Sequence, residues 1–183
     1  MKSEKEKMLA GELYFSGDQS LVDDRLMARM LTSEYNGTRA IEEEEREEIL
    51  KRLIVVKGDA KIQPPFHCDY GYNIEVGENF YANFSCTILD VNRVIIGDNV
   101  MFGPNVQVYT ATHPLDPKER IKGLESSKPI TIGDNVWIGG GAIILPGVTI
   151  GKNTTIGAGS VVTKDIPKNV LAGGNPCKII KEL

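Results

Sequence analysis

The most regular pattern of hydrophobic and polar positions begins near Val76 and repeats every six residues. The units "VGENFY" and "ANFSCT" are followed, after a slip, by "IGDNVM" and "FGPNVQ". From Ile132 six units run without a gap: "IGDNVW", "IGGGAI", "ILPGVT", "IGKNTT", "IGAGSV" and "VTKDIP". The first position is usually Ile or Val, the second is often Gly, and the fifth is mostly small or aliphatic.

A period of six fits neither an α-helix nor a single alternating strand. It fits a coil with flat sides about six residues long, in which each side directs an aliphatic residue inward and small residues form the corners. Stacked coils join these residues into an apolar column, where each contributes on the order of 1.5–3 kcal/mol of burial. The pattern therefore predicts a mainly β protein with a parallel β-helix over residues from about 58 to 180.

The N-terminal part of the chain has helical spacing instead. One helix is expected to begin at the N-cap Ser20 and to end at Asn36-Gly37, and a Glu-rich helix is expected to follow the cap Thr38. The expected buried face of the first helix contains Leu21, Leu26, Met30 and Leu31. The chain is thus divided into a helical segment, residues 1–54, and a β-helix domain, residues 55–183.

The six-residue pattern stops between about residues 110 and 130, where prolines and charges replace the hexads. This segment is expected to be a loop extruded from the β-helix, and loops of this length in compact domains are usually functional. His113 lies at its base. An isolated histidine there could simply hold the loop, but its place at the edge of a rigid scaffold favours a catalytic role.

An imidazole with a pKa near neutrality can act as a general base, accepting the proton of an alcohol as that alcohol attacks a carbonyl carbon. The tetrahedral oxyanion then needs fixed donors, and the glycine run 139–141 offers backbone N–H groups for this purpose. His67 is expected to be structural. Glu125, within the loop, contacts sugar hydroxyls or a neighbouring subunit, or is a solvated charge, and the sequence leaves these alternatives open.

Composition limits the classes of partner. Of the 183 residues 25% are charged, and the formal net charge of −4 argues against nucleic-acid binding, which requires a basic surface. No apolar run approaches the roughly 20 residues that span a bilayer, and the N-terminus "MKSEKEKMLAGEL" lacks the apolar core of a signal peptide. Three cysteines without paired spacing favour a reducing, cytoplasmic environment.

The hexads and their flanking motifs together resemble a known enzyme family. The motifs are "EKEKMLAGELY", "PPFHCDYGYNIEVGENFYANF", "YTATHP" and the stretch from "VWIGGGAIILPGVTIG" to "VVTKDIPKNVLAGGNPCKII". They resemble the hexapeptide-repeat sugar O-acetyltransferases, the family of the maltose and galactoside enzymes, over nearly the whole chain. The resemblance implies a left-handed β-helix, whereas the general crossover rule favours the right-handed form. It also implies acetyl-CoA as co-substrate, no metal, a sugar acceptor, and a homotrimer with active sites between subunits.

Matching motif positions then imply roles for residues of this chain. His113 carries the general base, and Asn83 in "FYANF" supports the tetrahedral intermediate. The acceptor-sugar positions are Ser16, Arg25, Asp69, Tyr81 and Asn83. The coenzyme path contains Trp137, Gly139, Gly140, Ala158, Thr163, Lys164, Lys178 and Lys181.

Departures from the galactoside enzymes concern several of these positions. Those enzymes have Asp where this chain has Val91, which leaves open whether Asp90 takes over that role. They have Ser at the position of Gly140 and Arg at the positions of Lys178 and Lys181. Coenzyme contacts are therefore expected through the backbone or through lysine, which attracts phosphate without the bidentate fork of arginine.

Two other functions remain alternatives on the sequence alone. A zinc-dependent carbonic anhydrase on the same scaffold needs about three imidazoles around the metal, and this chain has two histidines, His67 and His113. A non-enzymatic β-helix scaffold would give no reason for the pattern to break beside His113. Among acceptors, the sequence does not choose between maltose, glucose, galactosides and other hydroxylated molecules.

Overall fold

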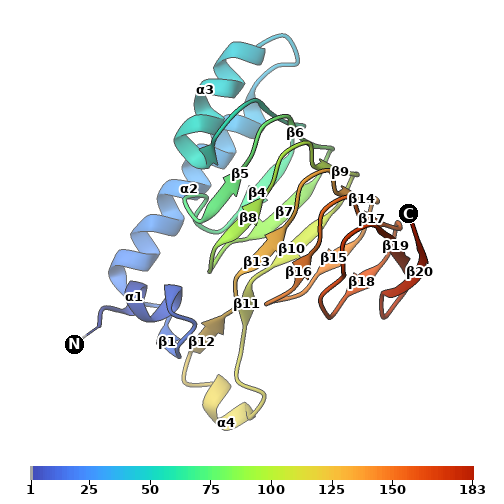
Figure 1. Ribbon diagram of the computed structural model, residues 1–183. Coiled ribbons are helices and arrows are strands. Elements are labelled where there is room, and N and C mark those ends of the chain that lie inside the picture. The colour runs from blue at the N-terminus through green and yellow to red at the C-terminus, as the bar shows by residue number, and fades with distance from the viewer. Residues whose placement is uncertain (1) are drawn as a thin grey trace.

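The computed structural model describes residues 2–183, and its main body is a β-helix built from three parallel sheets (Figure 1). One sheet contains β16 (Thr149–Ile150), β13 (Ile130–Ile132), β8 (Val94–Ile96), β5 (Ile74–Val76) and β2 (Val55–Val56). A second contains β18 (Val161–Val162), β15 (Ile143–Ile144), β10 (Gln107–Tyr109), β7 (Cys86–Leu89) and β4 (Phe66–Cys68). The third contains β20 (Lys178–Glu182), β19 (Val170–Gly173), β17 (Thr155–Ile156), β14 (Trp137–Ile138), β9 (Met101–Phe102), β6 (Phe80–Ala82) and β3 (Ala60–Ile62). The predicted solenoid is confirmed; it begins slightly earlier than expected, and β20 is antiparallel to β19.

The hexad pattern explains the core directly. The β-helix places Val76, Ile96, Ile132 and Ile150 opposite one another in successive coils, and each is at most 2% exposed. The glycine after each aliphatic residue is required by the close approach of the next coil. A Cβ on Gly133, for example, would lie 2.7 Å from the backbone nitrogen of Lys152.

An asparagine ladder follows one corner of the β-helix and fixes the turns after the glycines. Asn99, Asn135 and Asn153 have positive φ values of 54°, 56° and 56°, a conformation that asparagine tolerates better than most residues. Their side-chain amides form a chain, with Nδ2 of Asn99 donating to Asn135 at 3.2 Å and Nδ2 of Asn135 donating to Asn153 at 2.9 Å. The side-chain bonds between these turns link successive coils, although 36 residues separate Asn99 from Asn135 and 18 separate Asn135 from Asn153.

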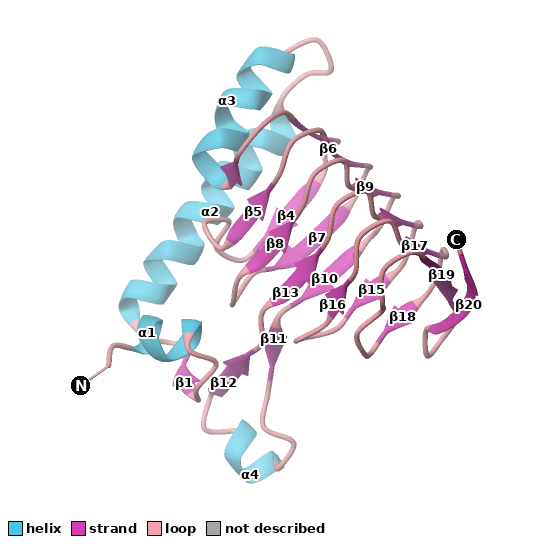
Figure 2. Cartoon of the chain, in the orientation of Figure 1, coloured by secondary structure: helices cyan, strands magenta, loops and turns pink. Residues whose placement is uncertain are grey.

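The N-terminal segment packs along one side of the first coils (Figure 2). It contains α1 (Glu4–Leu9), β1 (Tyr14–Phe15), α2 (Gln19–Gly37) and α3 (Glu43–Leu53). The N-cap of α2 is Asp18 rather than Ser20, and Asp18 accepts the Ser20 N–H at 3.1 Å. The Glu-rich helix starts at Glu43, later than predicted. None of the helices within residues 2–183 is long and apolar enough to cross a membrane.

The predicted buried face of α2 was partly wrong. Leu21 and Leu31 are buried, but Leu26 and Met30 are more than half exposed. The buried stripe consists of Leu21, Ala28, Leu31, Thr32 and Tyr35. These positions recur at intervals close to whole helical turns, which places them on a narrower face than the four apolar residues alone suggested.

The extruded segment is a hairpin with a helical tip rather than an irregular loop. Its elements are β11 (Ala111–Thr112), α4 (Pro117–Arg120) and β12 (Leu124–Ser127). The central strand β12 pairs antiparallel with β11 on one side and with β1 of the N-terminal segment on the other. The strand β1 is a short addition to the mainly helical segment that was expected, and it pairs the N-terminal segment with the extruded hairpin.

Candidate active site

A cleft of about 270 Å³ lies where the N-terminal segment, the β-helix and the extruded hairpin meet. Its lining residues are Ser16, Arg25, Arg29, Asp69, Tyr70, Leu89, Val91, Ala111, His113 and Glu125. The cleft therefore brings together five predicted site residues from three distant parts of the sequence: Ser16, Arg25, Asp69, His113 and Glu125.

His113 follows β11 directly, and the backbone before it is held on both sides. Ala111 and Thr112 pair with Ser127 and Ser126 of β12. The base of the hairpin is closed by the Lys128 N–H, which donates to the carbonyl of Thr110 at 2.9 Å. The ring of His113 is exposed at the cleft, so it lies on a fixed backbone and remains accessible to a ligand.

Arg25 connects three walls of the cleft. Its Nη1 donates to the hydroxyl of Tyr70 at 2.7 Å, and its Nη2 donates to the carbonyl of Ser16 at 2.7 Å. Burial raises the pKa of Asp69, and the positive charge of Arg25 opposes this effect. The cleft thus combines carboxylate acceptors with guanidinium donors, a set of groups that can hydrogen-bond to the hydroxyls of a polar ligand.

Asp90 shapes the cleft from beneath and does not line it. This carboxylate is fully buried and accepts the N–H groups of Asp69 at 3.0 Å, Tyr70 at 2.9 Å and Asn73 at 3.3 Å. Burial raises the pKa of Asp90 to about 6, while the bond from the Tyr70 N–H acts in the opposite direction. Val91, not Asp90, faces the cleft, while Asp90 holds the backbone of Asp69 and Asn73 from the interior.

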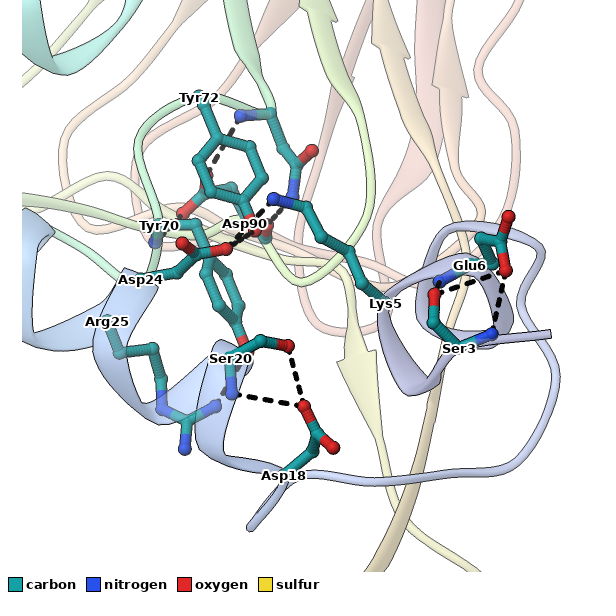
Figure 3. A network of polar contacts seen from close by, with 11 residues as sticks. Ser3, Lys5, Glu6, Asp18, Ser20, Asp24, Arg25, Tyr70, Tyr72 and Asp90 are labelled. Carbon is teal, nitrogen blue, oxygen red and sulfur yellow. Dashed lines mark hydrogen bonds and ion pairs between the residues drawn. The ribbon is translucent and has the colours of Figure 1, made fainter.

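The segment that Asp90 holds is also tied to the helices, as Figure 3 shows. The hydroxyl of Tyr72 donates to Asp24 of α2 at 2.9 Å, and the Lys5 ammonium donates to the same carboxylate at 2.9 Å. Lys5 also lies 4.1 Å from the centre of the Tyr72 ring. These contacts hold the wall that carries Asp69 against α2.

A second group of predicted residues lies along a different feature, one corner of the β-helix. Backbone N–H groups on this corner donate to the next coil: Asn83 to Phe102, Gly103 to Ile138, Gly139 to Ile156, and Gly157 to Ala172. The corner ends beside β20, where Lys178 is paired with Gly173. Asn83 and the lysines of β20 therefore mark opposite ends of one continuous edge.

The side chain of Asn83 is oriented by its own neighbour. Its Oδ1 accepts the N–H of Phe84 at 2.8 Å. Its Nδ2 donates to no acceptor among the described residues 2–183. Asn83 therefore presents an amide N–H₂ group that can stabilise a developing negative charge.

The glycine run was expected to supply oxyanion donors, and two of its three N–H groups are already used. Gly139 donates to Ile156 at 2.7 Å, and Gly141 donates to Pro104 at 2.8 Å. The next coil also lies too close for a side chain at Gly139, because a Cβ there would lie 2.5 Å from the nitrogen of Ala158. Gly139 therefore allows the next coil to approach, whereas Gly141 is favoured by its positive φ of 69°.

The remaining coenzyme candidates lie near the same corner and at the C-terminal end. Trp137 on β14 is 51% exposed and is paired with Met101 of β9. Thr163 and Lys164 follow β18 and are exposed, as are Lys178 and Lys181 on β20. Ala158 follows β17, and Gly140 lies in the turn after β14.

Two of the predicted acceptor residues, Tyr81 and Asn83, do not line the His113 cleft that residues 2–183 form. Tyr81 lines a separate hollow beside α3, with Glu47, Asp59 and Lys61 among its neighbours. Asn83 is likewise absent from the lining of the His113 cleft among residues 2–183. His67 lies exposed on β4, also outside that lining.

Sequence reasoning missed Tyr14, Arg29 and Tyr70. Arg29 had a usable signal, because it lies one helical turn after Arg25. Tyr14 and Tyr70 had none, since their places depend on chain segments that are distant in sequence. Within residues 2–183 no group of three or more His, Cys, Asp or Glu side chains is arranged to hold a metal ion.

Comparisons with known proteins place the chain in a family. Residues 7–55 match the maltose acetyltransferase hexapeptide capping motif, and residues 129–164 match the bacterial transferase hexapeptide repeats. A putative acetyltransferase of Dictyostelium discoideum is 56% identical over 99% of this chain and 95% of its own length.

Two solved structures extend the likeness to the whole fold. A maltose O-acetyltransferase from Clostridium difficile 630 is 55% identical with a TM-score of 0.97, covering 100% of this chain and 98% of that one. A galactoside acetyltransferase in complex with coenzyme A is 46% identical with a TM-score of 0.96, covering 100% and 92%. The β-helix is left-handed, as the resemblance implied. The chain therefore belongs to the hexapeptide-repeat acetyltransferases, in the family of the maltose and galactoside O-acetyltransferases.

Proposed function

We propose that the protein transfers the acetyl group of acetyl-CoA to a hydroxyl of a sugar such as maltose, glucose or a galactoside. The observation that carries this proposal is the cleft in which His113 lies beside Asp69, Arg25 and Glu125. The named activities of the similar enzymes supply the donor and the acceptor class.

The cleft residues suit an acceptor with several hydroxyl groups. Carboxylates of Asp69 and Glu125 accept hydrogen bonds from hydroxyls, and Arg29 can donate to hydroxyl oxygens. Ser16 adds a small polar group at the edge. With the sugar held by these contacts, His113 accepts the proton of one hydroxyl as its oxygen attacks the thioester carbonyl carbon. The resulting imidazolium can then protonate the departing thiolate.

We assign the stabilisation of the oxyanion of the tetrahedral intermediate to Asn83. The Nδ2 atom of Asn83 carries two N–H donors. The Phe84 N–H binds Oδ1 and so fixes the amide, which leaves the Nδ2 end directed away from the backbone. The Gly140 N–H is a second candidate donor, because the N–H groups of its neighbours Gly139 and Gly141 are bonded within the β-helix. Fixed donors of this kind lower the barrier because they need no reorganisation during the reaction.

Acetyl-CoA is proposed to lie along the corner from Asn83 to β20. The corner spans four coil steps between Asn83 and Gly173, or roughly 19 Å at the usual strand spacing. Such an edge accommodates an extended pantetheine arm, with the thioester near Asn83 and the phosphates near the C-terminal lysines. Trp137, Gly139, Gly140, Ala158 and Thr163 lie along or beside this path.

Replacing Lys164 and Lys178 together with alanine should raise the KM for acetyl-CoA about tenfold or more and leave the acceptor KM nearly unchanged. A charge-assisted contact is worth about 1.5–3 kcal/mol when well formed, and exposed lysines should lie at or below the lower end. Saturation curves for both substrates, at low and high salt, measure the effect, which screening should reduce. The control replaces Lys51 and Lys57, at the opposite end of the β-helix. An unchanged acetyl-CoA KM at low salt would contradict the phosphate role.

The separation of Asn83 from the His113 cleft supports a site completed by a second subunit. In one chain, Tyr81 and Asn83 lie on the third sheet and its corner, while His113 and its cleft lie at the extruded hairpin. Phe84, Met101 and Trp137 expose about half of their apolar side chains near that corner, as expected for a surface covered by a neighbour. We therefore infer a trimer in which one subunit supplies His113 and the next supplies Asn83.

Mixing two inactive variants tests this arrangement. His113→Ala and Asn83→Ala subunits, coexpressed in equal amounts, should regain about a quarter of the wild-type sites, because random trimers then contain interfaces with both residues intact. The measured quantity is turnover per subunit, with each variant expressed alone as the control. Recovery no greater than the sum of the two variants would mean that each site is formed within one subunit.

The acceptor class is tested by a panel of sugars. Release of the coenzyme thiol is followed with acetyl-CoA alone and with maltose, glucose or a galactoside added. Acceleration by one or more sugars is expected. A rate that does not depend on any hydroxylated acceptor would contradict the sugar O-acetyltransferase assignment.

A further inference from the structure

The first residues of the chain form a strap over the active-site hairpin. This N-terminal strap, residues 3–18, contains α1 and β1, and β1 pairs with β12 so that Tyr14 lies opposite Glu125 and Phe15 lies opposite Leu124. The pairing connects positions 111 residues apart. The strap therefore forms part of the cleft wall, and its contacts can act on the residues that meet the acceptor.

Tyr14 makes the most direct of these contacts. Its side chain is 1% exposed, and its hydroxyl donates to Oε2 of Glu125 at 2.6 Å. Burial, and then the nearby Glu125 carboxylate, raise the pKa of Tyr14 far above its usual value. The phenol therefore keeps its proton and acts as a permanent donor to the carboxylate.

Glu125 itself is half-buried and lines the cleft together with His113. Its other oxygen, Oε1, accepts no hydrogen bond from the described residues 2–183. A free glutamate side chain samples many rotamers, and ordering it on binding reduces affinity. The bond from Tyr14 removes much of that freedom before a ligand arrives.

We propose that Tyr14 is a positioning residue for acceptor binding: it fixes Glu125 through Oε2 so that Oε1 is presented to a hydroxyl of the acceptor in the His113 cleft. This role rests on the proposed sugar O-acetyltransferase function. It assigns to the strap a part in acceptor recognition and none in donor binding, because the corner assigned to acetyl-CoA lies on another part of the β-helix.

The strap does not depend on the Tyr14 hydroxyl for its attachment. Arg25 donates to the carbonyl of Ser16 at 2.7 Å, and the hydroxyl of Ser127 donates to the carbonyl of Met8 at 2.8 Å. Asn92 adds a further contact from the β-helix, because its Nδ2 donates to the carbonyl of Leu9 at 3.3 Å. Removing one hydroxyl group from Tyr14 should therefore leave the strap docked and change only the restraint on Glu125.

The test is Tyr14→Phe, assayed with acetyl-CoA and the best sugar acceptor of the panel. The acceptor KM should rise about 10- to 150-fold, the range expected for loss of a hydrogen bond to a charged group, and the acetyl-CoA KM should change less than about twofold. The matched control is Tyr35→Phe, which removes another buried hydroxyl, bonded to the carbonyl of Ile62 outside the cleft. That control should lower the thermal midpoint and leave both KM values unchanged.

A double variant separates positioning from a general structural effect. Glu125→Ala should raise the acceptor KM at least as much as Tyr14→Phe, and adding Tyr14→Phe to Glu125→Ala should have little further effect. Independent, additive effects would overturn the proposal, as would an unchanged acceptor KM in either single variant or equal rises in both KM values. Even if Tyr14→Phe proved unstable, an unchanged acceptor KM in Glu125→Ala would overturn the proposal. Wild-type protein that transfers no acetyl group to any sugar would instead refute the proposed function on which this role rests.

Discussion

Replacing His113 with alanine should lower kcat by about 10²–10⁴-fold, the usual contribution of a general base. Without the imidazole, an acceptor hydroxyl with its proton in place must attack the thioester, and solvent replaces a positioned base. The backbone before His113 is held by the pairing of β11 with β12, so the fold should persist. Initial rates at saturating acetyl-CoA and acceptor measure the loss.

Two controls make this result specific. Binding of acetyl-CoA to His113→Ala, measured by calorimetry, should be close to wild type, because the proposed donor path follows a different edge of the β-helix. His67→Ala should be much milder, since His67 lies on β4 outside the lining of the cleft. Equal losses of turnover from the two substitutions, with both proteins folded, would show that His113 is not the base.

Asn83→Ala should lower kcat by about 10²–10³-fold, as loss of one oxyanion donor typically does. The physical reason is that the Asn83 Nδ2 group has no protein acceptor within residues 2–183 and is free to meet the developing charge. The KM for the acceptor should change little, because the donor acts most strongly in the transition state. Turnover numbers at saturation give the measurement.

Asn83→Asp distinguishes catalysis from a structural role. An aspartate can still accept the Phe84 N–H, which is the bond that Asn83 Oδ1 makes, but it replaces the N–H donor with a negative charge. The proposed role predicts turnover as low as that of Asn83→Ala, or lower. Near-normal turnover of Asn83→Asp would show that only the contact with Phe84 matters.

Much of the fold could be predicted because each coil repeats the same local requirement. The column formed by Val76, Ile96, Ile132 and Ile150 is visible as the first position of one hexad in each successive coil, and His113 is visible as a histidine where the hexads stop. These features depend on periodicity, which a sequence displays directly. The left-handed winding of the β-helix has no such signal in the sequence and was predicted from the family resemblance.

Other features depend on contacts between segments that are distant in the chain. Strand β1 has two residues and no period of its own, and it exists because β12 is extruded beside it. The sequence predicted that the glycine run 139–141 supplies N–H donors for an oxyanion, but the N–H groups of Gly139 and Gly141 bond to carbonyls of neighbouring coils. The burial of Asp90 did have a signal: it continues the inward alternation of Cys86 and Ile88, all three being at most 1% exposed.

The most direct measurement of the central claim is identification of the product. Wild-type protein is incubated with acetyl-CoA and a neutral sugar, and the sugar is analysed by mass spectrometry and NMR. We expect an O-acetyl ester on one sugar hydroxyl, formed in proportion to released coenzyme A and strongly reduced in His113→Ala. Release of coenzyme A without an acetylated sugar would indicate thioester hydrolysis and contradict the proposed transfer.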